Sequence, residues 1–221
     1  MISFSWDWSI FDELIPALLG GLQTTIFVTL TGTALAMVLG LAFILLRMAQ
    51  IPLISMLVAG FSHVIRGTPL LIQLYFLFFV LPGYGVTLSP LATGVVALGL
   101  YYGVLASEIY RAGIENIPKG QWEASLSLSL PILWMWRRII LPQSIRMVIP
   151  MLGNLLVVMF KDSALLSAIA VTEMLSAARQ VAQDSYRFTE PYTAVGLVFL
   201  VVSYIAVLGI RRLERWSAKG G

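Results

Sequence analysis

From Glu108 to Pro150 the chain reads EIYRAGIENIPKGQWEASLSLSLPILWMWRRIILPQSIRMVIP. This is the longest interval without a lipid-compatible run, and it separates two strongly apolar segments. Short loops on the cytoplasmic side of a membrane carry the excess of Lys and Arg, so we expect this interval to face the cytoplasm. The basic residues within it are Arg111, Lys119, Arg137, Arg138 and Arg146.

The middle of this interval has an unusual composition for a simple connector. Glu123 is a lone acid among small residues, and bulky tryptophans flank it. Small residues let another surface approach closely, while the acid and the aromatic rings supply contacts. We interpret it as a docking surface; the alternative is a basic amphipathic loop that lies on the inner leaflet. The small residues are Gly120, Ala124, Ser125 and Ser127, and the tryptophans are Trp122, Trp134 and Trp136.

The composition indicates an integral membrane protein. Hydrophobic residues make up 59% of the chain and charged residues 11%, with a mean hydropathy of +0.90, whereas soluble domains average about 45–50% apolar and about 25% charged residues. The net charge of +3 comes from dispersed residues, which disfavours a nucleic-acid partner. With no cysteine and only His63 as histidine, the chain has neither thiolate nor clustered histidine ligands, and we expect no metal site.

The apolar runs predict an all-α protein with five transmembrane helices, because about 20 apolar residues cross a bilayer as a helix. Pro69 removes a backbone donor and disfavours helix at Thr68, so we expect an interfacial elbow at about 52–64 before the second span. Residues 171–190 carry mixed charge and predict an outer loop with a short helix. The spans are expected at about 20–46, 68–81, 90–110, 147–170 and 191–210.

Charge also predicts the orientation in the membrane. Residues 1–13 contain acids but no Lys or Arg, which does not fit a cleavable signal peptide and suits the outer face. Arg47 follows the first span, and Arg211, Arg212 and Arg215 follow the last. We therefore expect the N-terminus outside and the C-terminus in the cytoplasm.

Three motifs carry a resemblance to a known family. GQWEAS at 120–125, followed by LPQ at 141–143, resembles the EAA loop of membrane subunits of binding-protein-dependent ABC importers. RGTPLLIQ at 66–73 and FKDSALLS at 160–167 resemble the polar amino acid uptake branch of that family. The motifs occur in the family's order, and the resemblance extends from about Gly21 to the last apolar segment.

The resemblance implies a permease subunit in a bacterial inner membrane. Its implied partners are two ATP-hydrolysing subunits inside, a second identical or similar permease, and an external solute-binding protein. The chain itself has no G-x-x-x-x-G-K-[ST] phosphate loop, so we expect no catalytic residues here and ATP and magnesium on the partner ATPases. The coupling loop would span about 113–142, with a short helix at about 119–128. The coupling positions implied are Gly120, Trp122, Glu123, Ala124, Ser125, Ser129, Leu141 and Pro142.

Ser129 departs from the family pattern, which usually has glycine at the bend between the two loop helices. If the bend needs a left-handed residue, a side chain there costs roughly 1–2 kcal/mol. Pro131 partly offsets this by favouring the start of the next helix.

The candidates for the substrate pathway are Gln73, Glu108, Lys161 and Asp162. A zwitterionic solute needs an acceptor for its cation and a donor for its carboxylate, and Lys161 and Asp162 offer both. Each candidate also has a structural alternative: Arg111 can pair with Glu108 three residues away, and Lys161 with Asp162 can stabilise a subunit interface.

The solute class that the resemblance implies is polar amino acids, with opines or ectoine-type solutes as alternatives. From another class of protein, a self-sufficient secondary transporter or channel is a rival. Five spans without an internal repeat disfavour that plan. A membrane-embedded enzyme would need mutually placed catalytic groups, and the spans offer none.

Overall fold

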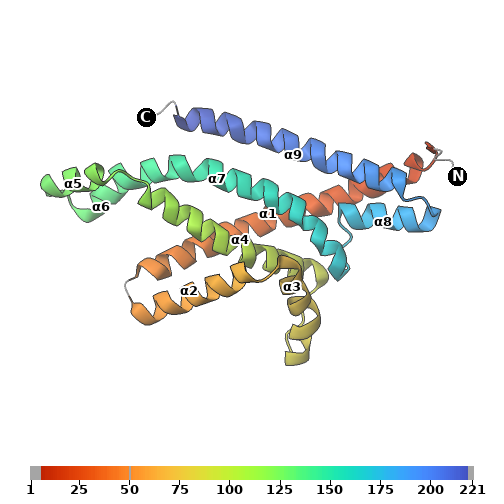
Figure 1. The fold of residues 1–221 in the computed structure, drawn as a ribbon, viewed down its shortest axis with the longest axis horizontal. Helices are drawn as coiled ribbons and strands as arrows, with labels where there is room; N and C mark the ends of the chain where they lie inside the picture. Colours follow the sequence, from red (N-terminus) through yellow and green to blue (C-terminus); the bar gives the residue numbers. More distant parts are fainter. Residues whose placement is uncertain (1–5, 50, 219–221) are drawn as a thin grey trace.

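The computed structural model describes residues 6–49 and 51–218, and every regular element among them is helical. Four helical units are long and apolar enough to cross a membrane, which confirms the predicted all-α membrane fold. They are α1 (Phe11–Met48), α4 (Pro90–Glu115), the continuous stretch Ile132–Ile169, and α9 (Thr189–Ala218). In Figure 1 these units run roughly lengthwise along the molecule.

A broken pair of helices supplies a possible fifth span. α2 (Pro52–Gly67) meets the segment Leu70–Tyr84 at an angle of 106°. That segment consists of α3 (Leu70–Tyr75), the π-helical turn η1 (Phe76–Val80) and the 3₁₀ turn η2 (Leu81–Tyr84). Thr68, between the two arms, has extended backbone angles (φ −116°, ψ 139°), as expected for a residue before proline. In Figure 1, α3 projects away from the other helices.

The remaining elements lie between the long helices. The first group is α5 (Lys119–Ser127), α6 (Ile132–Met135) and the π-helical turn η3 (Trp136–Ile140), which leads into α7 (Leu141–Asp162). The second group is the 3₁₀ segment η4 (Ser163–Ile169) and α8 (Met174–Ser185). α5 and α6 lie at one end of the molecule, and α8 lies at the other end with the start of α1 (Figure 1).

The helices run longer than the predicted spans. α1 begins at Phe11 rather than near residue 20, because Asp12 and Glu13 complement the positive end of the helix dipole in its first turn. α4 continues to Glu115 instead of ending near 110. An apolar run in the sequence indicates only the part of a helix that lies in lipid. The helix itself extends further, because its backbone hydrogen bonds continue until a capping residue ends it.

α1 and α4 cross at closely spaced small residues. A Cβ atom built on Gly40 would lie 2.7 Å from the Cβ of Ala106 and 2.9 Å from the carbonyl oxygen of Gly103. The α1 threonines use their hydroxyls within the helix, and the buried Thr29 donates to the carbonyl of Thr25 over 2.7 Å. Small residues and satisfied hydroxyls allow the two backbones to pack directly in an apolar environment.

α8 packs against the first half of α1. A Cβ atom on Gly21 would lie 2.7 Å from the Cα atom of Met174. Glu173 caps α8: its fully buried carboxylate accepts the backbone N–H groups of Leu175 (2.7 Å) and Ser176 (2.6 Å). Burial raises the pKa of Glu173 to about 7, although the two N–H donors act in the opposite direction.

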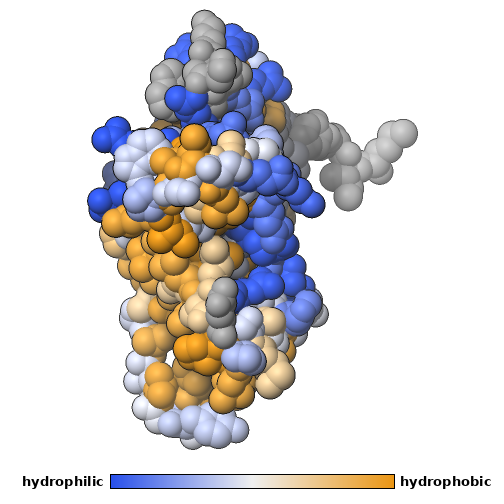
Figure 2. All heavy atoms as spheres, turned by 90° about the vertical axis from the view of Figure 1, so that its left-hand side faces the viewer, coloured by the Kyte–Doolittle hydropathy of each residue, from blue (hydrophilic) through white to orange (hydrophobic). Residues whose placement is uncertain are grey.

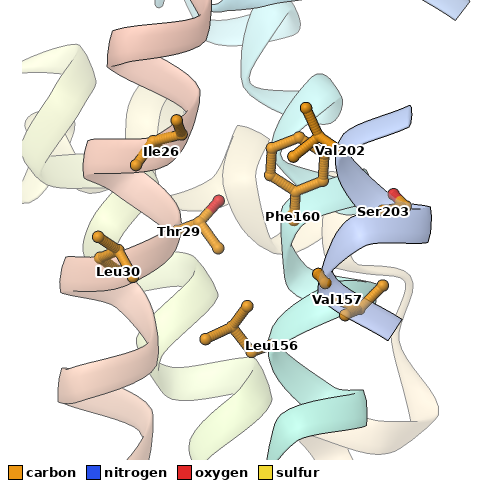
Figure 3. A pocket seen from close by; sticks show the side chains of 9 residues that line it. Ile26, Thr29, Leu30, Leu156, Val157, Phe160, Val202 and Ser203 are labelled. Atoms are coloured by element: carbon orange, nitrogen blue, oxygen red, sulfur yellow. The ribbon is translucent and has the colours of Figure 1, made fainter. Parts of the chain in front are cut away.

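α9 is the least buried long helix, with 11% of its most apolar window buried inside the chain. A small cavity of about 130 Å³ separates it and α7 from α1. Figure 3 shows Thr29 of α1 on one side of this cavity, Phe160 of α7 and Val202 of α9 on the other. The exposed apolar face of α9 suits contact with lipid.

The acidic N-terminal segment 1–13 is described only from Trp6 onward. Within it, the backbone N–H of Asp7 donates to a Glu190 carboxylate oxygen over 3.1 Å. Arg187 contacts the carboxylates of both Asp7 and Glu190. This segment is therefore attached to the start of α9.

Candidate functional site

The interval that the sequence marks as a docking surface folds into two short helical pieces that pack on each other. Trp122 of α5 and Trp136 of η3 meet edge to face, with ring centroids 5.5 Å apart and an interplanar angle of 81°. Beneath them lies a small apolar core. The pair therefore forms a rigid tip rather than a flexible connector. The buried members of this core are Ile117, Met135 and Ile140.

The bend between the two pieces requires a left-handed residue, and that residue is Ser129 with φ +51°. The N–H of Ser129 donates to the carbonyl of Leu126 (2.9 Å), and the N–H of Leu130 donates to the carbonyl of Ser125 (3.1 Å). These two bonds make a Schellman motif, the usual end of a helix at a left-handed residue. Ser129 therefore holds a backbone conformation that glycine adopts with less strain.

The tip exposes a mixed surface. Glu123 and Ala124 are exposed, and a Cβ atom on Gly120 would meet nothing within 4 Å. Four apolar side chains on the same two pieces are between 62% and 72% exposed, and the motif alone did not predict this apolar surface. Figure 2 looks onto this end of the molecule, where hydrophobic and hydrophilic surfaces adjoin. The four apolar side chains are Leu126, Leu128, Ile132 and Leu133.

Two of the predicted coupling residues face inward instead. Ser125 is 2% exposed, and its hydroxyl donates to the carbonyl of Gln121 over 2.6 Å. Trp122 is half-buried against Trp136. These two residues shape the tip, while Gly120, Glu123 and Ala124 are available to a partner. Ser129, Leu141 and Pro142 are also exposed.

The tip is attached to the spans at a close contact between α4 and α7. The Ser144 hydroxyl donates to the carbonyl of Gly113 over 3.0 Å. A Cβ atom on Gly113 would lie 2.4 Å from Val148 Cγ2. These contacts hold the end of α4 against the start of α7, next to the tip.

Glu108 lies at the centre of an ion-pair cluster. Its carboxylate is 2.7 Å from Arg111 of the same helix and 2.8 Å from Arg47 at the end of α1. Arg66 at the end of α2 is 4.0 Å away. The sequence suggested the pairing with Arg111 but not those with Arg47 and Arg66. The only sequence signal for these two was that each is a basic residue near the end of a helix. Glu108 thus joins α1, α2 and α4.

Gln73 serves the bend between α2 and α3. Its Nε2 atom donates to the carbonyl of Ile65 (2.8 Å), the carbonyl of Thr68 (3.1 Å) and the Thr68 hydroxyl (2.8 Å). These contacts satisfy backbone groups that the break in the helix leaves open. The amide donors of Gln73 are therefore already engaged.

Lys161 and Asp162 have different surroundings, as expected for neighbours on a helix. Asp162 accepts a 2.6 Å hydrogen bond from the hydroxyl of Tyr102, which is buried on α4. The side chain of Lys161 is exposed, and no hydrogen bond or ion pair to its ammonium group is found within residues 6–49 and 51–218.

Comparison with known proteins identifies related sequences over nearly the whole chain. Residues 39–219 match the family described as "Binding-protein-dependent transport system inner membrane component". The chain is 38% identical to the probable amino-acid ABC transporter permease protein y4tG of Sinorhizobium fredii, over 97% of this chain and 95% of that protein. It is 35% identical to the L-cystine transport system permease protein TcyB of Bacillus subtilis, over 97% and 93% of the two chains. It is 31% identical to the glutamine transport system permease protein GlnP of Escherichia coli, over 95% and 97%.

Solved structures give the same relationship at the level of the fold. A chain from a structure described as an amino acid ABC transporter with histidines superposes with a TM-score of 0.92 at 31% identity, covering 96% of this chain and 99% of that one. A chain of the inward-facing MetNI methionine ABC transporter superposes with a TM-score of 0.68 at 17% identity, covering 96% and 99%. The second likeness concerns the fold alone.

Proposed function

Because the chain belongs to the family of binding-protein-dependent transport system inner membrane components, we propose how it carries out transport. It is a membrane permease subunit of an ABC importer, and the ATPase is a separate subunit. The observation that carries the proposal is the agreement over 96% of the chain, at a TM-score of 0.92, with a chain of an amino acid transporter.

The solute of this importer is an amino acid. Relatives at 31–38% identity are named for glutamine, cystine or amino acids in general. We assign a small zwitterion with a polar side chain, delivered by a soluble binding protein on the outer side. Opines and ectoine-type solutes have no named counterpart among the three relatives compared above.

The tip formed by α5, α6 and η3 is the proposed contact with the ATPase. Glu123 and Ala124 are exposed on the same tip as four exposed leucine and isoleucine side chains. A carboxylate within an apolar surface fits a groove that offers one basic residue and apolar walls. Closure of two ATPases would draw two such tips together and switch the spans between two packed states. This action requires two permease chains, one for each ATPase.

Lys161 is the proposed pathway residue among the four candidates. Gln73 and Glu108 already use their polar groups within the chain, and Asp162 accepts from Tyr102. Lys161 is exposed, and its ammonium group would pair with either the carboxylate of the solute or the second permease. Among the described residues, no group of three His, Cys, Asp or Glu could hold a metal ion.

The orientation follows from charge. We place the α5–α6 tip and the C-terminal end of α9 in the cytoplasm, and the N-terminus with α8 outside. The basic residues near the tip and at the end of α9 support this choice. The membrane is then the bacterial inner membrane.

Reconstitution tests the proposal. The permease would be placed in liposomes with its ATPase and its binding protein, and uptake of labelled amino acids would be measured with and without ATP. We expect uptake only with both partners and ATP. Ion-driven flux through the permease alone would favour a secondary transporter, and ATP-driven uptake restricted to a different solute class would refute the assigned substrate.

A further inference from the structure

A groove of about 500 Å³ lies between the last turns of α1, the end of α4 and the start of α7. Its volume is within the range of sites that hold a small organic molecule, roughly 300–1,000 Å³. Its lining includes Leu41 and Leu45 of α1, which are more than half exposed, Ile114 of α4, and Ile145 and Val148 of α7. The groove is open toward the surroundings of the helices.

The two hydroxyl groups in the lining are already satisfied by the protein. The Ser144 hydroxyl donates to the carbonyl of Gly113 over 3.0 Å. The Tyr110 hydroxyl donates to the carbonyl of Met37 over 3.3 Å. A polar solute would therefore find no free partner on these two hydroxyls, whereas a hydrocarbon chain would lose nothing by contact with them.

Two cations directly follow a groove residue in the sequence of η3. Trp136 lines the groove, and Arg137 and Arg138 follow it directly in η3. Trp136 and Leu141 both line the groove. They are five residues apart, which is the spacing of one π-helical turn. Both arginine side chains are exposed, and no ion pair or hydrogen bond to either guanidinium group occurs in the described part of the chain.

We propose that this groove binds one anionic phospholipid of the inner leaflet, with an acyl chain along the apolar walls and the phosphate beside Arg137 and Arg138. Basic pockets between transmembrane helices on the cytoplasmic side favour anionic head groups. The charge at the rim selects this occupant over an apolar protein segment. The assignment depends on the proposed orientation of the chain, because it places the tip on the cytoplasmic side.

The bound lipid would support the coupling tip. Trp136 forms part of the groove and also packs edge to face on Trp122 of α5, with 5.5 Å between ring centroids. An acyl chain in contact with Trp136 would limit the movement of the Trp136 ring, which packs on Trp122 of α5. The lipid would thereby stabilise the position of the tip relative to the spans.

Native mass spectrometry of the purified complex tests the rim of the site. The complex would be equilibrated with mixtures of phosphatidylglycerol and phosphatidylcholine, and the retained lipid counted for each permease chain. The Arg137→Gln/Arg138→Gln variant should retain phosphatidylglycerol roughly 30-fold more weakly, because each basic residue near an anionic surface contributes about fivefold. The matched control is Arg211→Gln/Arg212→Gln, which removes two cations at the end of α9 and should retain it as the unaltered complex does.

A second variant tests the walls. Ile145→Trp fills the groove and should displace phosphatidylglycerol and phosphatidylcholine alike, whereas Leu197→Trp on the exposed face of α9 should not. Unchanged retention in both groove variants overturns the proposal. So does a disulfide between two permease copies through Ile145→Cys, because the groove is then a subunit contact. Lipid retention needs neither ATP nor solute, so a failure here is separate from a failure of the proposed transport.

Discussion

Ser129 shows how one residue can be retained in a conformation that it disfavours. Its φ of +51° lies in the left-handed region, where a side chain costs roughly 1–2 kcal/mol relative to glycine. The Schellman hydrogen bonds and the core beneath Trp122 and Trp136 impose this conformation. The tip is therefore less stable than the same tip with glycine.

Ser129→Gly should stabilise the tip by about 1 kcal/mol, because it removes the left-handed strain without disturbing a contact. The measurement is the thermal unfolding midpoint of the purified complex, with protection of residues 119–140 from proteolysis as a local readout. The control, Ser127→Gly, loses a hydrogen bond to the carbonyl of Glu123 within α5 and should destabilise. A lower midpoint for the Ser129 variant would contradict the prediction.

Lys161→Met tests the pathway role of the exposed ammonium. We expect solute uptake to fall at least about tenfold while assembly and basal ATP hydrolysis persist, because a charge-assisted contact contributes roughly 1.5–3 kcal/mol. Uptake and hydrolysis would be measured in the same liposomes. Arg179→Met, which removes an exposed cation from α8, serves as the control. Failed assembly of the Lys161 variant would assign the residue to the subunit interface instead.

Glu173 predicts a pH-dependent attachment of α8. Its pKa is about 7 in the folded chain against an ordinary value of 4.5, so the folded state holds an additional proton between these values. The contribution to stability is complete below about pH 4.5 and is lost as pH rises toward 7. Unfolding midpoints measured from pH 4.5 to 7.5 should fall, and Glu173→Gln should flatten this slope. Asp184→Asn, at an exposed carboxylate of α8, should keep it.

At the scale of helices, packing between α1 and α4 depends on the absence of side chains. The backbones approach at Gly40, where a Cβ atom would be 2.9 Å from the Gly103 oxygen. A backbone atom cannot move aside as a flexible side chain can. A Cβ atom on Gly20 of the same helix would meet nothing within 4 Å, which provides an internal comparison.

Gly40→Ala should destabilise the permease by about 1–3 kcal/mol through overpacking. Gly20→Ala should have the opposite sign, since alanine favours a helix by about 1 kcal/mol over glycine. Both values would come from unfolding midpoints of the two variants in one detergent. Equal effects would mean that the close approach at Gly40 does not control the crossing.

Residue pattern was sufficient to predict most elements, but not their extents. The interfacial elbow predicted at about 52–64 corresponds to α2, which ends at the bend before Pro69, and the short helix predicted within 171–190 corresponds to α8. Both follow from local rules for proline and for mixed-charge segments. The π-helical turns η1 and η3 were not predicted. Such a turn contains one more residue than an α-helical turn, and no particular residue type marks that insertion.

At the scale of the whole molecule, the tip and the start of α1 lie at opposite ends of the helices (Figure 1). In the orientation proposed above, the tip would meet the ATPase in the cytoplasm, and the opposite end would meet the binding protein. The ion-pair cluster around Glu108 ties α1, α2 and α4 together. Movements of these helices are therefore correlated.

Single cysteines test the docking face without background, because the chain has no cysteine of its own. Gly120→Cys should cross-link to the ATPase, since its position is open and lies at the start of α5. Gly83→Cys is equally open but lies in η2, away from the tip, and should not. The products would be read by gel electrophoresis and peptide mass mapping. Reaction of Gly120→Cys only with a reagent confined to the outer medium would refute the proposed orientation.

The sequence by itself determined the class of protein: long uncharged runs must be helical in lipid, because no water is present there to satisfy the backbone. It also predicted a docking interval from small residues and a lone acid, and the family resemblance drew attention to Ser129, where the family usually has glycine. Family membership followed from three motifs in order.

Only the tertiary structure decided which of these residues are available to a partner. Ser125 and Trp122 face inward, Gln73 and Glu108 are engaged within the chain, and Lys161 remains exposed. The groove beside Arg137 arises from three helices that are distant in sequence. The physical reason is that a side chain is available to a partner only where nothing else in the fold packs against it. Those contacts form between segments that are distant in sequence, and the local residue pattern does not show which segments meet.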